Sequence, residues 1–244
     1  MTVSEFLGRF VFTRKCPVCG ELMGYERRAE AFCAECRMRW DVAKTRECSV
    51  CGQSVCECVC MPKALSVAGA LCHHKAVLYS SYEPVSHKTV MFIKRNKNPR
   101  VSGFLAAQLA SVLEADKDLP VLDAENTVIT FVPRGREAVI KYGFDQSMLL
   151  AQALSSKMGI PWIRAVRRVR GGREQKKLSA AQRQKNVKGL YAPEDTLEAA
   201  VANKNVILID DVVTTGASMA VSTKLLIRAR ARTVICLSVG ATEK

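Results

Sequence analysis

Cysteine is the residue that most constrains this chain, because nine of its eleven cysteines lie between Cys16 and Cys60. Two Cys-x-x-Cys pairs, Cys16/Cys19 and Cys33/Cys36, are separated by 13 residues. Each pair lets two thiolates converge on one side of a tight turn, and two such pairs complete a tetrahedron around zinc. The spacing therefore predicts a structural zinc held by four thiolates.

A second cysteine group follows, and its spacing is less regular. Cys48 and Cys51 form a further Cys-x-x-Cys pair, after which Cys56, Cys58 and Cys60 stand at alternate positions. Three cysteines compete for two ligand positions, so we expect a second zinc but leave open which two bind it. A redox or disulfide module is the alternative; it is disfavoured because the pairs repeat among Gly, Pro and charged residues. Apolar residues are too few here for a core, so we expect metal binding to fold this region.

The composition changes after Met61 and Pro62. We place a boundary there, between a double zinc ribbon at residues 1–62 and a larger domain at residues 63–244. Outside the cluster, Cys72 next to His73 and His74 stands alone, and Cys236 lies in an apolar run typical of a core.

Strand and helix patterns alternate along the larger domain. We expect a pair of strands at Ala64–Cys72 and Val77–Tyr82, and short buried strands at Thr127–Val132, Asn205–Ile209 and Thr233–Val239. Apolar residues at helical spacing predict helices over 85–95, 100–115, 144–158 and 217–229. Continuous apolar strands between helices predict an α/β fold, with a parallel sheet covered by helices on both faces.

The net charge of +14 is concentrated in two segments. Residues 88–100 hold five basic and no acidic side chains, and residues 164–188 hold ten basic and one acidic, whereas residues 1–62 carry a net charge of only +1. We expect a polyanion such as phosphate, pyrophosphate or nucleic acid to meet the two basic segments, the alternative being a solvated basic face.

Hydropathy indicates where the protein resides. No run approaches 18 apolar residues, so we expect no membrane span. Glu5 and Arg9 interrupt the N-terminal stretch where a signal peptide needs an apolar run, so we expect a cytoplasmic location.

One strand-to-helix junction carries the candidate binding site. Asp210 and Asp211 follow a run of apolar residues, and the small or hydroxylated residues Thr214, Thr215, Gly216, Ala217 and Ser218 then open into a helix. Backbone N–H groups and hydroxyls at a helix N-terminus bind phosphate, whereas two carboxylates suit ribose hydroxyls or a divalent cation. A ribose 5-phosphate fits both halves of the junction.

The junction resembles, at every position, the motif that binds phosphoribosyl pyrophosphate in type I phosphoribosyltransferases. The resemblance extends over nearly the whole chain to the competence protein F family, which includes the gluconate-utilisation protein X type and joins a double zinc ribbon to a phosphoribosyltransferase domain. Its other motifs resemble Tyr82-x-Pro84 with Lys94, Val132-Pro133, Gly143-Phe144-Asp145-Gln146-Ser147, and Arg170, Gln175, Leu178, Arg183 and Asn186. Tyr142 stands where the family usually has Arg, and Asp145 where it usually has Asn. The missing Arg leaves open any catalytic role assigned to it, without disturbing the sugar-phosphate site.

The resemblance implies a mechanism and its residues. Pyrophosphate leaves the anomeric carbon of the sugar, and Mg²⁺ and cations meet the charge that develops on it. Arg134-Gly135-Arg136 resembles a pyrophosphate loop, and the basic segment with Gly171-Gly172 resembles a loop that closes over the site. Arg134, Arg170 and Arg173 are then candidate catalytic partners of the pyrophosphate beside Asp210 and Asp211, with Gly135 in the binding loop.

Two functions follow from the sequence. The first is a phosphoribosyltransferase whose ribose acceptor the sequence does not identify. The second is a non-catalytic protein that handles single-stranded DNA during natural transformation, as the family's link to competence implies. DNA would then contact the two basic segments, since the zinc ribbon is nearly neutral. A third option is that the ribbon serves only as a docking surface for protein partners.

Overall fold

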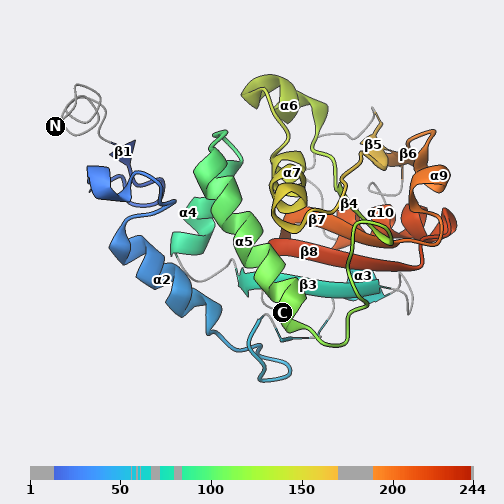
Figure 1. Ribbon diagram of the computed structural model, residues 1–244, viewed down its shortest axis with the longest axis horizontal. Helices are drawn as coiled ribbons and strands as arrows, with labels where there is room; N and C mark the ends of the chain where they lie inside the picture. The colour runs from blue at the N-terminus through green and yellow to red at the C-terminus, as the bar shows by residue number, and fades with distance from the viewer. Residues whose placement is uncertain are drawn as a thin grey trace.

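The computed structural model describes residues 14–55, 57–58, 60, 62–66, 72–79, 84–169 and 189–242. A four-stranded parallel sheet lies at the centre, in the order β3-β8-β7-β4 (Figure 1). These strands are β3 (Cys72–Tyr79), β8 (Thr233–Ala241), β7 (Asn205–Val213) and β4 (Thr127–Phe131). Their apolar runs are buried, as expected for a parallel sheet, and the predicted fold class is confirmed.

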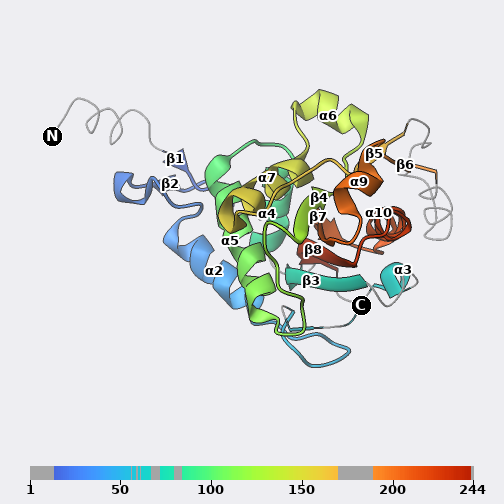
Figure 2. The same ribbon diagram turned by 45° about the vertical axis from the view of Figure 1, so that its right-hand side comes forward.

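Helices cover both faces of this sheet (Figures 1 and 2). α5 (Pro99–Ala115) and α7 (Gln146–Met158) pack together on one face, and α10 (Ala217–Arg228) packs on the other with α9 (Leu197–Val201). Residues of β7 alternate between two hydrophobic cores, with Ile207 in the core under α5 and α7 and Leu208 in the core under α10. α4 (Pro84–Ile93) and α5 agree with the predicted helices, as do α7 and α10 within a few residues.

Two smaller elements flank the sheet. α6 (Arg136–Tyr142) precedes α7, and an antiparallel hairpin of β5 (Val166–Arg168) and β6 (Tyr191–Pro193) stands beside β4. The basic loop between β5 and β6, which contains Arg170 and Arg173, lies outside the described residues.

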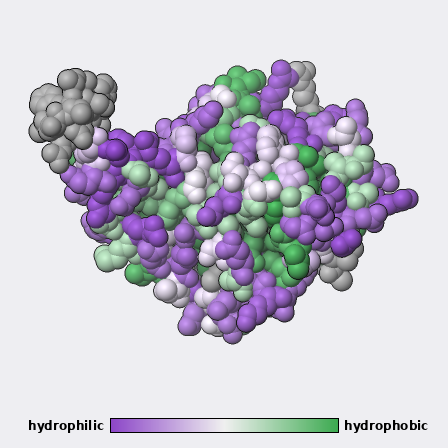
Figure 3. Space-filling view, in the orientation of Figure 1, coloured by the Kyte–Doolittle hydropathy of each residue, from purple (hydrophilic) through white to green (hydrophobic). Residues whose placement is uncertain are grey.

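The N-terminal ribbon comprises β1 (Arg14–Lys15), β2 (Leu22–Met23), η1 (Tyr25–Arg27) and α2 (Ala34–Lys44). Contrary to the expectation of too few apolar residues, Trp40 and Phe32 are fully buried and meet Phe104 of α5, with ring centroids 5.4 and 5.0 Å away. The ribbon thus shares a hydrophobic core with the larger part of the chain, because aromatic side chains provide large apolar area from few positions. Figure 3 shows hydrophilic residues predominating on the outer surface of this region.

The predicted strand pair at Ala64–Cys72 and Val77–Tyr82 is wrong. Residues Lys63–Ser66 form a short helix, α3, and a single strand, β3, runs from Cys72 to Tyr79 with β8 as its parallel partner. The polar residues at the start of β3 interrupt the apolar pattern by which a buried strand is predicted from sequence. Lys75 is nevertheless buried there, because its Nζ lies 2.7 Å from a carboxylate oxygen of Asp116.

Among the described residues, no helix is both long enough and apolar enough to cross a lipid bilayer.

Candidate functional site

Two adjacent carboxylates lie near the carboxyl end of β7, which is four residues longer than predicted. Oδ2 of Asp211 accepts a hydrogen bond from Nε2 of Gln146 at 2.9 Å and lies 3.3 Å from Nζ of Lys94. Oδ1 of Asp210 accepts a hydrogen bond from the Ser147 hydroxyl at 3.2 Å. The ends of α4 and α7 therefore orient the pair, since Lys94 follows α4 and Gln146 begins α7.

Burial and the charge of Asp211 raise the pKa of Asp210 well above its usual range, although Lys94 and Ser147 oppose the shift. The two carboxylates thus repel each other in a poorly solvated position. A cation, or a ligand that donates hydrogen bonds to them, would relieve that repulsion. The site is suited to such a partner.

The phosphate loop, residues 214–218, connects β7 to the 12-residue helix α10. Gly216 precedes the helix with φ of +75°, a left-handed conformation that glycine adopts without strain. Thr214 and Thr215 are exposed, and the Ser218 side chain is hydrogen-bonded to Tyr191 of β6. The N–H of Ala217 donates to the Thr215 hydroxyl at 3.4 Å. The start of a helix and the exposed hydroxyls would suit this loop to an anion.

Arg134 lies at the end of β4, next to the carboxylates. Its backbone N–H donates to Oδ2 of Asp145 at 2.7 Å, and its Nη1 donates to the carbonyl oxygen of Lys94 at 2.8 Å. The guanidinium carbon stands 4.8 Å from the centre of the Tyr142 ring. Arg134 therefore holds the pyrophosphate-loop segment to α4 and α6.

These contacts give a structural account of both departures from the family pattern. Tyr142 provides an aromatic face for the guanidinium of Arg134. Asp145 caps α7 by accepting from the N–H groups of Ser147 and Met148, and it also accepts from Arg134, whereas an amide side chain has only one acceptor oxygen. Burial raises the pKa of Asp145, against the effect of these N–H donors.

Arg168 is a site residue that we did not single out in the sequence. Its guanidinium atoms lie 3.7 Å from the position that a Cβ on Gly135 would take, and its Cζ lies 5.7 Å from the centre of the Tyr191 ring. It stands at the base of the basic loop. The only sequence signal for Arg168 was its position within the basic segment 164–188.

The first cysteine group is brought together as predicted: the sulfur atoms of Cys16, Cys19, Cys33 and Cys36 lie within 4.8 Å of one another. Sγ of Cys19 and Sγ of Cys33 are 3.6 Å apart. Four thiolates about 2.3 Å from a central zinc stand about 3.8 Å from each other, so the donor set and its spacing fit zinc.

The second group consists, in the part of the chain that the structure describes, of Cys48, Cys51, Cys58 and Cys60. Cys56 lies outside the described residues. Both groups repeat one turn: the N–H of Gly20 donates to the carbonyl of Cys16 at 2.9 Å, and the N–H of Gly52 donates to that of Cys48 at 2.8 Å.

Tyr79, the last residue of β3, is hydrogen-bonded to the sulfurs of Cys48 and Cys58. Burial of Cys48 is outweighed by this bond and by bonds from the N–H groups of Val50 and Cys51, which lower its pKa to about 6. The pKa of Cys58, in contrast, is raised to about 12 by burial and by Cys48 and Cys51, so a bound cation would be needed to hold this thiol in its thiolate form.

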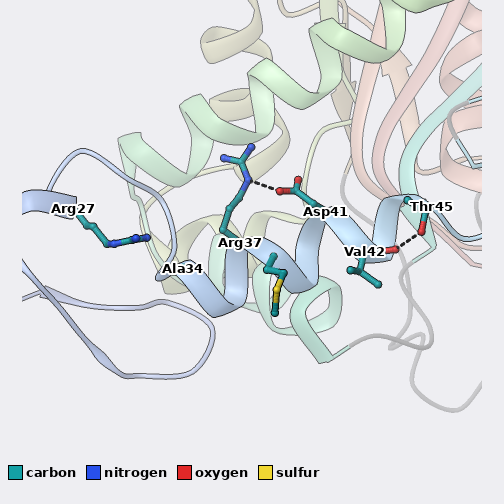
Figure 4. A pocket seen from close by; sticks show the side chains of 7 residues that line it. Arg27, Ala34, Arg37, Asp41, Val42 and Thr45 are labelled. Atoms are coloured by element: carbon teal, nitrogen blue, oxygen red, sulfur yellow. Dashed lines mark hydrogen bonds and ion pairs between the residues drawn. The ribbon is translucent and has the colours of Figure 1, made fainter.

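A shallow groove on the ribbon lies outside this site. Figure 4 shows Arg27, Ala34, Arg37, Asp41, Val42 and Thr45 along it, and its volume is about 480 Å³. Nε of Arg37 lies 3.0 Å from Asp41, and the Thr45 hydroxyl donates to the carbonyl of Val42. Its polar groups are therefore paired with one another, and Met38 and Val42 add exposed apolar surface.

The structure brings together most of the predicted site residues. Asp210, Asp211 and the phosphate loop share one end of the sheet with Arg134 and Gly135, whereas Arg170 and Arg173 are outside the described residues. Lys94, Gln146 and Ser147 were noted only as parts of family motifs, and the structure places them against the carboxylates.

Comparison with known proteins agrees with this arrangement. Residues 145–241 match the family described as phosphoribosyl transferase domain. The DNA utilization protein YhgH of Salmonella typhi is 32% identical over 219 residues, which cover 83% of this chain and 93% of that protein. The chain belongs to the family of these proteins. The relative from Salmonella typhimurium is 30% identical over 216 residues, with the same coverage of both chains.

Membership of this family confirms the resemblance to the competence protein F type, with a phosphoribosyltransferase domain preceded by two four-cysteine groups. The solved structure of the allosteric regulatory enzyme of purine biosynthesis aligns with 61% of this chain and 30% of that chain, at 21% identity and a TM-score of 0.39.

Proposed function

We propose that this protein binds phosphoribosyl pyrophosphate and transfers its ribose 5-phosphate to an acceptor. The observation that carries the proposal is the junction in β7 and α10, where two carboxylates adjoin a loop of small and hydroxylated residues at a helix N-terminus. Few ligands present hydroxyl groups and a phosphate at this spacing, and a ribose 5-phosphate does. We place the activity in the cytoplasm, where thiols stay reduced and able to bind metal.

Different residues of the site bind different parts of the ligand. The N–H groups and hydroxyls of residues 214–218 bind the 5-phosphate, and Asp210 and Asp211 accept hydrogen bonds from the ribose hydroxyls. Lys94, Arg134 and Arg168 supply positive charge on the pyrophosphate side, joined in this proposal by Arg170 and Arg173 of the basic loop. Mg²⁺, when bound, would neutralise part of the pyrophosphate charge, with Asp210 and Asp211 as its nearby carboxylates.

The chemistry needs charge stabilisation more than acid–base catalysis. As the bond to the anomeric carbon breaks, negative charge grows on the leaving pyrophosphate and positive charge grows on the sugar ring. Fixed cations near the leaving group and fixed carboxylates near the ring stabilise that separation in the transition state. Lys94 is suited to the first task because its ammonium already lies at the junction, 3.3 Å from Asp211.

We further propose that each four-cysteine group holds a structural zinc. Four thiolates leave no open coordination position, so these zinc ions would stabilise the ribbon and take no part in the transfer.

Calorimetry of the zinc-loaded protein with phosphoribosyl pyrophosphate and Mg²⁺ tests the proposed site. We expect saturable binding that is lost in the Asp210→Asn/Asp211→Asn variant and kept in Asp195→Asn, a control at an exposed acid near α9. Absence of binding by the unmodified protein would refute the proposal. Acceptor-dependent release of pyrophosphate would then identify the acceptor.

The relatives favour a second candidate, because they are called DNA utilization proteins. On this reading the protein handles single-stranded DNA without catalysis. Exposed Arg95, Lys97 and Arg100 continue from Lys94 across the start of α5, so a basic surface borders the site. Neutralising basic residues in 88–100 and 164–188 should then abolish binding of single-stranded DNA, whereas Asp210→Asn/Asp211→Asn should retain it. DNA affinity that is unchanged by neutralisation, or independent of salt, excludes this candidate.

A further inference from the structure

The phosphate loop is held at its start and at its middle residue by residues outside the loop. At its start, the carbonyl oxygen of Val213 accepts from the N–H of Thr242 at 2.9 Å and from its hydroxyl at 3.3 Å. Thr242 directly follows β8, so the chain after this strand holds the residue that precedes Thr214.

In the middle of the loop, Gly216 packs against the segment that follows the cysteine groups. A Cβ on Gly216 would lie 3.0 Å from Cβ of Pro62 and 3.3 Å from Cγ of Leu65. Leu65 is fully buried, and α3 packs on α10. The backbone at the start of α10 therefore rests directly on two side chains.

The residues that hold the loop also adjoin the second cysteine group. Pro62 and Thr242 line one small cavity of about 20 Å³ together with Cys48, Cys58, Cys60 and Tyr79. That volume leaves room for about one water molecule, so the side chains around the cavity are closely packed. A movement of the cysteines would therefore displace Pro62 and Thr242. Tyr79 adds a direct link, because its side chain is hydrogen-bonded to Cys48 and Cys58 and its backbone pairs with Ala241, next to Thr242.

The first cysteine group offers an internal comparison. It is built on β1, β2 and the start of α2, at the end of the molecule away from α10 (Figures 1 and 2). The two groups share ligand type and turn geometry, but only the second adjoins Pro62 and Thr242 within the described residues.

We propose that the metal-loaded second cysteine group positions the phosphate loop, with Pro62, Leu65, Tyr79 and Thr242 as the positioning residues. The inference rests on the proposed function only for the identity of the ligand. Metal in the second group and a phosphorylated ligand in the loop then stabilise each other. By linkage, the ligand must raise the metal affinity of the second group by the same factor by which the metal raises the affinity for the ligand.

Differential alkylation of the cysteines tests this linkage in the unmodified protein. A chelator is added with or without phosphoribosyl pyrophosphate and Mg²⁺, and alkylated cysteines are identified by mass spectrometry over time. We expect the ligand to slow alkylation of the second group by about fivefold or more, with no effect on Cys16, Cys19, Cys33 and Cys36. Once calorimetry has shown that the ligand binds, equal protection of both groups, or of neither, contradicts the proposal.

A ligand-free readout separates this inference from the proposed function. Amide hydrogen exchange of residues 214–220 is compared between Cys51→Ser and Cys19→Ser, which remove the exposed second cysteine of the Cys-x-x-Cys pair in either group. We expect faster exchange in the phosphate loop only for Cys51→Ser. If the unmodified protein binds no phosphoribosyl pyrophosphate, the proposed function is wrong. The exchange rates of Cys51→Ser and Cys19→Ser still show whether the second cysteine group is coupled to the phosphate loop.

Leu65→Ala tests the positioning residue with both metal groups intact. We expect about tenfold weaker ligand binding and faster loop exchange, with Leu65→Met restoring both because it refills the contact with Gly216. Leu226→Ala, at an equally buried position near the other end of α10, controls for loss of stability. If Leu226→Ala weakens ligand binding as much as Leu65→Ala, the role of Leu65 is only structural and the proposal is wrong.

Discussion

At the scale of a single residue, Asp210 is expected to lower the stability of the ligand-free protein while it contributes to ligand binding. Its folded-state pKa is raised by burial and by the charge of Asp211. Between the unfolded and the folded pKa the native state binds the extra proton, so stability falls as pH rises through this range. Ionisation of Asp210 in its buried position therefore costs the ligand-free protein stability.

We therefore predict that Asp210→Asn increases the thermal stability of the ligand-free protein while abolishing ligand binding. The gain should be largest at pH 7 to 8 and should disappear as the pH approaches about 4, the pKa of an unfolded aspartate. Thermal unfolding followed by circular dichroism across this pH range measures it. A variant that is less stable than the unmodified protein at pH 8 contradicts the assigned environment of Asp210.

Asp145 provides a second prediction at this scale. Asp145→Asn keeps an oxygen for the N–H groups of Ser147 and Met148 but turns an N–H₂ group toward the N–H of Arg134. We expect it to lower the free energy of unfolding by about 1 kcal/mol, and Asp145→Ala, which also removes the helix cap, by about 2 kcal/mol. Urea unfolding of the two variants checks the order. Equal stability of Asp145→Asn and the unmodified protein would show that the bond to Arg134 contributes nothing.

At the scale of elements, the start of α10 is constrained twice, by its backbone conformation and by its neighbours. Gly216 and Gly143 both have positive φ, +75° and +78°, but a Cβ on Gly143 meets nothing within 4 Å. The two glycines therefore separate the cost of the left-handed backbone from the cost of the contact with Pro62 and Leu65.

We predict that Gly143→Ala costs about 1 to 2 kcal/mol, the penalty of a left-handed backbone. Gly216→Ala should cost about 1 to 3 kcal/mol more, because its Cβ must displace Pro62 and α3. Denaturant unfolding of both variants gives the difference. Equal costs would mean that the phosphate loop moves away from Pro62 without resistance.

At the scale of the whole molecule, the ribbon and the α/β part share one core through Trp40, Phe32 and Phe104. We expect a ribbon connected in this way to unfold with the rest of the chain. The domain boundary after Pro62 stays a prediction from composition.

We predict a single thermal transition for the metal-loaded protein, which shifts to lower temperature as a whole when a chelator removes metal. Trp40→Ala should destabilise that same transition by about 3 to 5 kcal/mol. Far-ultraviolet circular dichroism and calorimetry of the full chain test both. Two separate transitions, only one of which responds to the chelator, would contradict the shared core.

Much of the site could be predicted from residues close together in the sequence. Cys-x-x-Cys spacing, the carboxylate pair with its phosphate loop, and the apolar strands are local patterns whose geometry depends on a few neighbouring residues. The structure confirms the parallel sheet and the helices and assembles the first cysteine group as predicted. The strand expected at Ala64–Cys72 failed because α3 is held by packing on α10, some 150 residues away along the chain.

The sequence by itself determined the class of fold, the two cysteine clusters and the strand-to-helix junction that carries the carboxylate pair, because short-range geometry and burial leave few alternatives for such patterns. Only the tertiary structure decided that Lys94 and Gln146 orient Asp211 and that Pro62 and Leu65 support Gly216. These contacts join segments far apart in the chain. The packing of the whole molecule selects among them, and no local pattern records that selection.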